Sequence, residues 1–553
     1  MSGNRKAFGI AVYCGLALAL VACGKEQQIK TPGASYFDLM ETPVGDVDFP
    51  VGCNAKAAPM VERGVALLHH MMYDEANFVF GMADDADPDC ALAFWGQAMT
   101  IIHPLWPDTP TPEQIEQGSA LVVKSLLLGG HSDRENAYLE TTAAYYADAA
   151  ALTEGERLAK FEAAWRALSE ANPDDLEARA FHSLALRATA APAGSDLSVP
   201  RAAGALAESV LAENPNHPGA HHYIIHAYDY PELAERAAAT ADHYGEITPK
   251  VPHATHMMTH IYTRLGDWQK AIDWNTISAE TAWAICVETG EINLHYTHAL
   301  DYLAYAYLQK GEDGAMLEIL QTAEALQPPY SKTNRHASAY AFAALPARYA
   351  LERRDWTAAA ALEPRMPSTF PWETAHDPYV AITHFTRAIG FARLGKPAEA
   401  DADIAALDDL RASIAPASPY WAQQVAIQAA TARAWQTYAT GSADVALEQM
   451  RDAADMEAST EKHALTPGEV LPAAELYGDM LLETGNFAQA LSAYRTALRR
   501  SPHRYNSLYG AAKAALGEGD EETATTYYAA LIDIAGDASE QRTSTREAQD
   551  FLK

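Results

Sequence analysis

The chain has 553 residues, of which 49% are hydrophobic, and its formal net charge at pH 7 is -33. So acidic a protein repels nucleic acid and anionic lipid headgroups, which excludes a nucleic-acid-binding protein and one held to membranes by basic residues. The length allows about three to four globular domains or one long repeat array.

Residues 1–22 have the pattern of a signal peptide. Arg5 and Lys6 precede an uncharged stretch that is rich in Ala, Leu and Val and is short for a membrane span. The run Leu20-Val21-Ala22-Cys23 then resembles the lipobox of bacterial lipoproteins. The resemblance implies cleavage before Cys23 and more than one acyl chain on that cysteine, which is what stable membrane anchoring needs. The alternative is a plain secretory signal with an unmodified cysteine.

Residues 23–50 form a polar segment of Gln, Lys, Thr, Pro, Gly and Asp with little periodicity. Such a composition predicts a flexible tether, here lipidated at its first residue. Gly24 stands where lipoproteins retained at the inner membrane usually have Asp. We therefore expect a lipid anchor in the outer membrane of a bacterial envelope, with the folded part facing the periplasm.

Two distant segments carry the same spacing of small, aromatic and proline residues. Counted from a glycine, the offsets +12, +16, +19 and +24 are filled in the first segment (Gly64, Ala76, Phe80, Ala83, Pro88) and in the second (Gly478, Ala490, Tyr494, Ala497, Pro502). Small residues let two antiparallel helices approach, the aromatic fills the groove, and Pro ends the second helix. The spacing resembles the 34-residue tetratricopeptide repeat, TPR.

Weaker copies of this pattern lie between the two segments, around Gly266, Gly311 and Gly395. Alanine-rich amphipathic stretches alternate with short Gly, Pro or Asp turns, and alternating β-branched stretches are scarce. The sequence therefore predicts an all-α fold, a TPR-like helical-hairpin solenoid. Residues 51–440 make up the solenoid with its central histidine-rich region, and residues 441–553 add C-terminal repeats. Irregular breaks are expected at residues 189–201, 327–333, 364–378 and 415–419.

Three cysteines remain beyond the lipidated one: Cys53, Cys90 and Cys286. An oxidising periplasm permits one disulfide among them. We predict Cys53–Cys90, because the repeat phasing places each near the start of the first helix of adjacent helical pairs. The alternative is two buried free thiols.

Histidines with helical spacing gather in the middle third of the chain. Three clusters combine histidine with aspartate or with further histidines: His222, His226 and Asp229; His253, His256 and His260; His295, His298 and Asp301. Each cluster lies on one face of a helix, and imidazoles at i and i+4 can hold one metal ion. Since a solenoid stacks neighbouring segments, these stripes are predicted to converge on one pocket.

Imidazole and carboxylate ligands suit zinc, iron or manganese, and the adjacent Met257 and Met258 would admit copper. The alternative is that the histidines are buried structural groups that hydrogen-bond inside the helix packing. For His69 and His70 we expect such packing, and for His103 a turn in which Trp106 packs.

Several segments, in this order and spacing, resemble one family, the large bacterial TPR proteins with HHYxIHA and HxxxHIYxRxG signatures. They include GCNAKAAPMVERGVALLHHMMYDEA, HPLWP, HHYIIHAYD, HMMTHIYTRLGDW and LPAAELYGDMLLETGNFAQAL. The resemblance covers nearly the whole mature chain. It implies a helical solenoid and supplies no settled biochemical activity.

Two functions follow from these features. A membrane-tethered periplasmic scaffold that binds a protein or peptide in its groove is the preferred interpretation, because solenoids do this by default. The alternative is a metal-dependent hydrolase or redox enzyme built on the central histidines. The chain contains no GxSxG, P-loop, CxxC or GxGxxG motif, and it lacks the glutamate of a thermolysin-type HExxH helix, so the sequence favours the non-enzymatic role.

Overall fold

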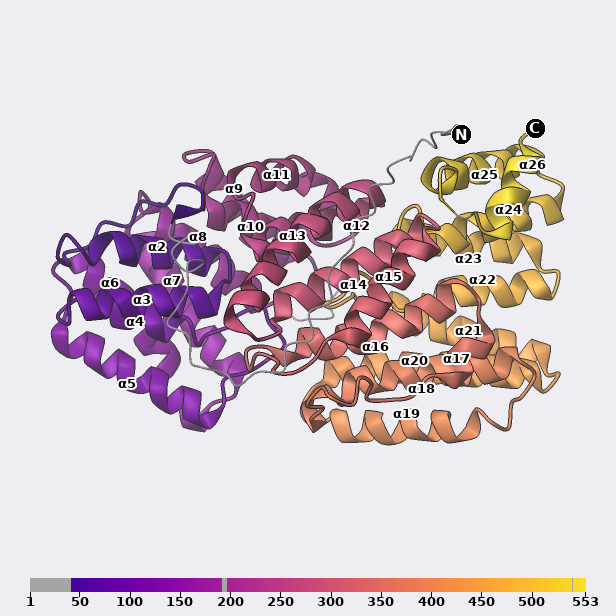
Figure 1. The fold of residues 1–553 in the computed structure, drawn as a ribbon, viewed down its shortest axis with the longest axis horizontal. Helices are drawn as coiled ribbons and strands as arrows, with labels where there is room; N and C mark the ends of the chain where they lie inside the picture. The colour runs from indigo at the N-terminus through magenta and orange to yellow at the C-terminus, as the bar shows by residue number, and fades with distance from the viewer. Residues whose placement is uncertain (1–40, 191–195, 540) are drawn as a thin grey trace, which may run out of the picture.

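The computed structural model describes residues 41–190, 196–539 and 541–553, and their regular structure is helical. The signal peptide, Cys23 and most of the predicted tether lie outside these residues. Successive helices pack as antiparallel pairs along one solenoid (Figure 1). The predicted all-α, TPR-like architecture is confirmed. None of the helices in the described residues is long and apolar enough to cross a membrane.

The N-terminal half runs from α2 to α13. Its helices are α2 Ala58–His69, α3 Tyr73–Ala86, α4 Ala91–Met99, α5 Pro112–Leu128, α6 Asp133–Tyr146, α7 Glu154–Ala171, α8 Leu176–Ala188, α9 Ser198–Leu211, α10 Pro218–Tyr228, α11 Ala234–Ile247, α12 Pro252–Leu265 and α13 Trp268–Thr289, with a short 3₁₀ helix at Ala149–Ala151. Side-chain caps begin several of them: Thr111 and Thr153 each close a capping box before α5 and α7.

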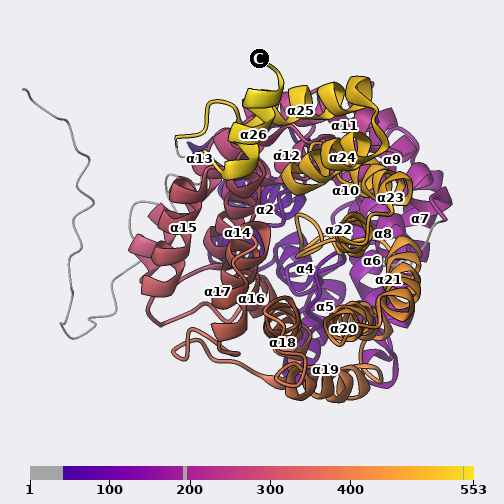
Figure 2. The same ribbon diagram turned by 90° about the vertical axis from the view of Figure 1, so that its right-hand side faces the viewer.

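The C-terminal half curves round one end of the molecule, as Figure 2 shows for α16 to α26. Its helices are α14 Leu294–Gln309, α15 Asp313–Ala325, α16 Arg335–Glu352, α17 Trp356–Ala361, α18 Asp377–Arg393, α19 Asp401–Ile414, α20 Pro419–Ala439, α21 Ala443–Ala458, α22 Ala473–Glu483, α23 Phe487–Arg500, α24 Tyr505–Glu518, α25 Glu521–Ala535 and α26 Thr543–Phe551, with a second 3₁₀ helix at Thr374–His376. The boundary drawn at residue 440 falls in the turn between α20 and α21, which pack against each other.

The segment that precedes α2 is attached to the solenoid at two points. Phe49, from the predicted tether, is buried and stacks on Trp95 with ring centroids 5.7 Å apart. Cys53, just before α2, is bonded to Cys90 at the start of α4, with 5.0 Å between their Cα atoms. Cys286 is a buried free thiol. The part of the chain that packs on the solenoid therefore begins before residue 51.

Aromatic rings lie directly over glycines where consecutive helices cross. Phe80 of α3 fills the space between Gly64 of α2 and Gly96 of α4, where added Cβ atoms would come within 2.6 Å and 2.3 Å of its ring. Tyr494 of α23 lies in the same way between α22 and α24. These are the small and aromatic positions that the repeat spacing predicted, and their contact sets how closely the helices approach.

Four inner helices, α10, α12, α14 and α16, are buried on almost every side. A helix at the surface would bury one stripe only. Two non-helical segments contribute to this burial. In residues 100–111, Trp106 packs against histidine rings of α12 and α14. Residues 459–472 form ion pairs and hydrogen bonds with α12, α16 and the C-terminal end of α10. The interior of the solenoid is therefore filled by its own chain.

Substituting Gly96→Ala is expected to destabilise the protein by about 1–3 kcal/mol, because the new methyl group overlaps the Phe80 ring. The matched control is Gly81→Ala in α3, whose added Cβ would meet no atom of the described chain within 4 Å. That change should be neutral or stabilising by up to about 1 kcal/mol, since alanine favours helix over glycine. The midpoint of urea denaturation, followed by circular dichroism, measures both; equal effects would contradict the packing argument.

Candidate metal centre

The central histidines come from three inner helices. His222 and His226 lie on α10, His253, His256 and His260 on α12, and His295 and His298 on α14; all seven are buried. Six of them gather into two groups within the described residues. In each group, every histidine has a ring nitrogen that lies within 4.8 Å of a ring nitrogen of each of the other two.

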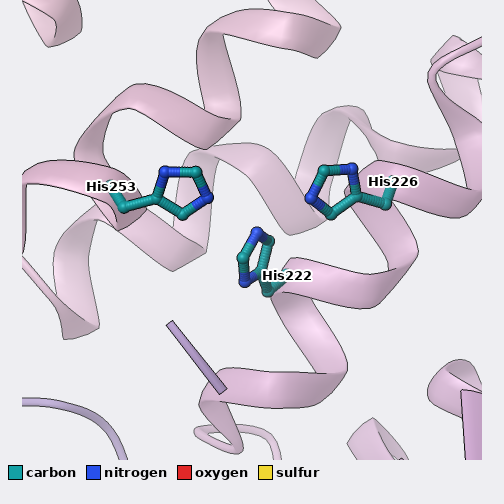
Figure 3. Close-up of side chains that lie close together, drawn as sticks. All are labelled: His222, His226 and His253. Atoms are coloured by element: carbon teal, nitrogen blue, oxygen red, sulfur yellow. The ribbon is translucent and has the colours of Figure 1, made fainter. Parts of the chain in front are cut away.

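The first triad consists of His222, His226 and His253, whose rings converge in Figure 3. The second triad consists of His256, His260 and His298. Both follow one rule: an i,i+4 pair on one helix is completed by a histidine of the next inner helix. The predicted convergence therefore produces two neighbouring sites, one repeat apart, instead of one pocket.

Hydrogen bonding leaves the first triad with unused ring nitrogens. The Nδ1 of His222 lies 2.6 Å from the backbone oxygen of His69, and since a carbonyl only accepts, Nδ1 donates and Nε2 keeps its lone pair. That Nε2, the Nε2 of His226 and both ring nitrogens of His253 are buried without a hydrogen-bond partner among the described residues. A buried polar atom without a partner is costly, and a metal ion bound among these rings would satisfy several such nitrogens at once.

The second triad brings two bare nitrogens face to face. His256 Nδ1 lies 2.8 Å from Oδ1 of Asn275, whose own amide nitrogen donates to the oxygen of Ala271, so His256 Nδ1 is the donor. His260 Nδ1 lies 3.1 Å from Oδ2 of Asp229 and 3.2 Å from the Tyr302 hydroxyl, and because a carboxylate only accepts, Nδ1 donates to Asp229. Both Nε2 atoms then carry lone pairs, and they are only 3.1 Å apart. A tetrahedral metal with bonds of about 2.0–2.1 Å would hold two nitrogens roughly 3.3 Å apart.

Burial favours the neutral form of the imidazoles in both triads. Burial lowers the pKa of His222 to about 3. Burial, together with the neighbouring His298 and His260, holds the pKa of His256 well below its usual range. Neutral imidazole is the form that binds a metal ion.

Asp229 lies behind the second triad and orients it. Its Oδ1 accepts a hydrogen bond from Arg264 Nε at 2.8 Å, and its Oδ2 accepts from Lys462 Nζ at 2.7 Å and from His260. Burial alone would raise the pKa of Asp229, but Lys462 and Arg264 outweigh it and hold that pKa well below the usual range. A carboxylate that fixes the tautomer of a ligand histidine is a common feature around metals.

The remaining predicted site residues lie beside the triads. Asp301, one turn beyond His298, is fully buried and forms an ion pair with Arg348. His295 packs 5.3 Å from His253, centroid to centroid, and its Nδ1 is unpartnered within the described part of the chain. Trp106 contacts both rings at 6.2 Å and 6.5 Å, in the turn where sequence reasoning expected it to pack.

A third group, His69, Glu177 and His217, has similar spacing but different bonding. Nε2 of His69 lies 2.6 Å from one oxygen of Glu177, and Nε2 of His217 lies 3.2 Å from the other. The remaining nitrogens are occupied too, since Tyr223 Oη contacts His69 Nδ1 at 2.9 Å and the Ala220 amide donates to His217 Nδ1. Three of the four ring nitrogens of this group are hydrogen-bonded, and the fourth, His217 Nε2, faces Glu177 without forming a hydrogen bond. We therefore interpret this group as a structural cluster.

Sequence reasoning missed the groups that hold the triads in place. Asn275 and the His69 carbonyl fix the tautomers of His256 and His222, and Lys462 reaches Asp229 from 233 positions away. No local spacing links these residues. Tyr302, which packs 4.6 Å from His256, could have been noticed, because it stands on α14 where the repeat of α12 has His260.

No family model and no curated protein matches this chain. Among solved structures it is similar to a chain of the crystal structure of the APC/C hetero-tetramer Cut9–Hcn1, with 12% identity, a TM-score of 0.33, and coverage of 91% of this chain and 76% of that one. It is also similar to an IFIT1 monomeric mutant with Gppp-AAAA (12%, 0.32, 91% and 100%) and to yeast Tom70 (12%, 0.31, 90% and 95%). Similarities this low support no argument about function.

Substituting Arg348→Met is expected to cost about 3–5 kcal/mol, because it leaves the Asp301 carboxylate buried without its cation. The double variant Arg348→Met, Asp301→Leu should regain most of that loss, since it removes both charges. Urea denaturation of the two variants beside the parent measures the difference. A double variant no more stable than the single one would show that the pair is not the source of the effect.

Proposed function

We propose that this protein is a bacterial envelope lipoprotein whose TPR-like solenoid binds transition-metal ions at two buried three-histidine sites. The observation that carries the proposal is the pair of bare Nε2 atoms of His256 and His260, 3.1 Å apart, each with its Nδ1 committed to another acceptor. Two lone pairs at that distance repel unless a cation lies between them.

The surroundings of both triads support the same role. In each triad at least one ligand ring is oriented by a hydrogen bond from its far nitrogen, to the His69 carbonyl in the first and to Asn275 and Asp229 in the second. Such hydrogen bonds fix the orientation of the ring and leave its other nitrogen, the one that faces the triad, free to bind a metal ion. The repeat then supplies two sites of the same design.

The hydrolase alternative has less support. Asp229 and Asp301, which were the candidates for a general base, are occupied by Arg264, Lys462 and Arg348. Lys462 and Arg264 hold the pKa of Asp229 well below its usual range, which makes Asp229 a weak base. Burial raises the pKa of Asp301 to about 6, but Asp301 is bound to Arg348 and belongs to neither triad. We therefore favour a protein that holds or carries metal over an enzyme that activates metal-bound water.

A protein-binding role is the second candidate, and it needs a surface other than the filled interior. A groove of about 690 Å³ runs between α21, α22 and α23, lined by charges of both signs and by Tyr477. Arg451, Arg499 and Arg500 face Asp455 and Glu461 there. An extended peptide of mixed charge would suit this groove.

The lipid anchor is proposed from the lipobox-like run that ends at Cys23. Beyond it the chain is strongly acidic, so attachment to an anionic membrane would depend on the acyl chains and not on charge. Periplasmic exposure at the outer membrane would also suit the Cys53–Cys90 disulfide, because disulfides persist in oxidising compartments.

The mature protein, purified without a histidine tag and reconstituted with metal, is expected to hold two metal ions per chain. His226→Gln should remove one ion and His260→Gln the other, because each variant breaks one triad. His384→Gln is the matched control, since His384 bonds Asp403 outside both triads. Elemental mass spectrometry measures the metal content. Absence of stoichiometric metal from the reconstituted parent would overturn the proposal.

Substituting Cys23→Ser is expected to abolish incorporation of radiolabelled palmitate and to move the protein from the membrane fraction to the soluble fraction. The reason is that acylation of that thiol would be the sole anchor. Cys286→Ser, at a buried free cysteine, is the control and should keep both label and membrane association. A Cys23→Ser protein that still sediments with membranes would contradict the anchor.

A further inference from the structure

Building on the proposed function, we infer that both triads select copper in its monovalent state, Cu(I), over divalent ions such as Zn²⁺. The inference rests on the charge, spacing and number of ligands around the two sites. It takes the metal-binding role as given and names the ion.

The charge balance at the sites disfavours a dication. All six ligands are neutral imidazoles, and the triads contain no carboxylate among the described residues. The closest acidic group, Asp229, is already paired with Arg264 and Lys462, and Arg264 also pairs with Glu461. These charges balance, so no negative charge is left to offset a dication. The cost of burying an uncompensated ion rises with the square of its charge. The free-energy cost of burying a monovalent ion is therefore about a quarter of the cost of burying a divalent ion of the same size.

The second reason is the closeness of the two sites. They are separated by one repeat, and their rings approach at two places: His226 and His260 at 6.1 Å, and His253 and His256 at 6.2 Å between centroids. Two dications repel each other four times as strongly as two monocations at the same separation. Filling both triads at once is therefore much easier with Cu(I).

The third reason is the number of ligands. Each triad offers three nitrogens in a buried setting, and a zinc ion held by three protein ligands takes a water molecule as its fourth ligand. Manganese and magnesium prefer oxygen ligands, which the triads lack, whereas imidazole suits both copper and zinc, so the number of ligands and not their type separates these two ions. A three-coordinate ion needs nothing beyond the histidines present, so the preference does not require sulfur from Met257 or Met258.

The test is a competition experiment on the full mature protein, purified without a tag and freed of metal. Under anaerobic conditions it is titrated with Cu(I) in the presence of bathocuproine disulfonate, and separately with Zn²⁺ in the presence of a chromogenic zinc chelator. We expect two Cu(I) per chain and Zn²⁺ binding at least 100-fold weaker. X-ray absorption of the Cu(I) form should show three nitrogen neighbours per ion.

Three variants, one of them a control, make the outcome more specific. His260→Gln should reduce the count to one Cu(I), while His384→Gln should leave two. Lys462→Met removes a buried positive charge beside Asp229 and should raise the affinity for Zn²⁺ more than that for Cu(I), because the repulsion scales with ionic charge. Circular dichroism checks that each variant is folded.

The possible failures are distinguishable. Stoichiometric Zn²⁺ that binds as tightly as Cu(I) or more tightly would overturn the Cu(I) assignment and leave the metal-binding function standing. Absence of binding by either ion would overturn both. An unchanged ratio of the two affinities in Lys462→Met would overturn the electrostatic basis of the preference.

Discussion

The close approach of consecutive helices at glycine–aromatic contacts is the constraint on which the structure depends. Where Phe80 lies over Gly64 and Gly96, a side chain on either glycine would push the helices apart. Tyr228 of α10 makes the same kind of contact with Gly204 of α9. Where helix pairs are held at this distance, equivalent positions of successive repeats come into register, and side chains spaced along one helix meet those of the next.

That register explains why the two triads share one design. A pair at i and i+4 on an inner helix presents two rings on the same side, and the next inner helix supplies the third ring from a neighbouring row. The third ring comes from a different position in each triad: His253 corresponds to His295 of α14, whereas the second triad uses His298, which corresponds to His256. The series ends at α14, where Tyr302 replaces the second histidine of the pair.

This chain differs from a solenoid with an open groove because its own segments fill the interior. Residues 459–472 connect α21 to α22 and bring Lys462 to Asp229 and the Gly468 carbonyl to Arg348. These contacts keep the carboxylates near the triads occupied by cations. The histidines lie in a buried region where several ring nitrogens, and also Oδ2 of Asp301, have no hydrogen-bond partner among the described residues.

Local sequence determined the helices, the two glycine–aromatic repeats and the i,i+4 histidine pairs, because each depends on residues within one or two turns or one repeat of each other. It could not decide that His253 joins the α10 pair or that His298 joins the α12 pair, since those choices depend on the spacing and rotation between helices. The sequence spacing grouped Asp229 and Asp301 with the histidines. In the tertiary structure, Asp229 forms ion pairs with Arg264 and Lys462, and Asp301 forms one with Arg348. Only long-range packing could decide these pairings, because a buried carboxylate pairs with whichever cation the fold brings to it, however distant that cation is along the chain.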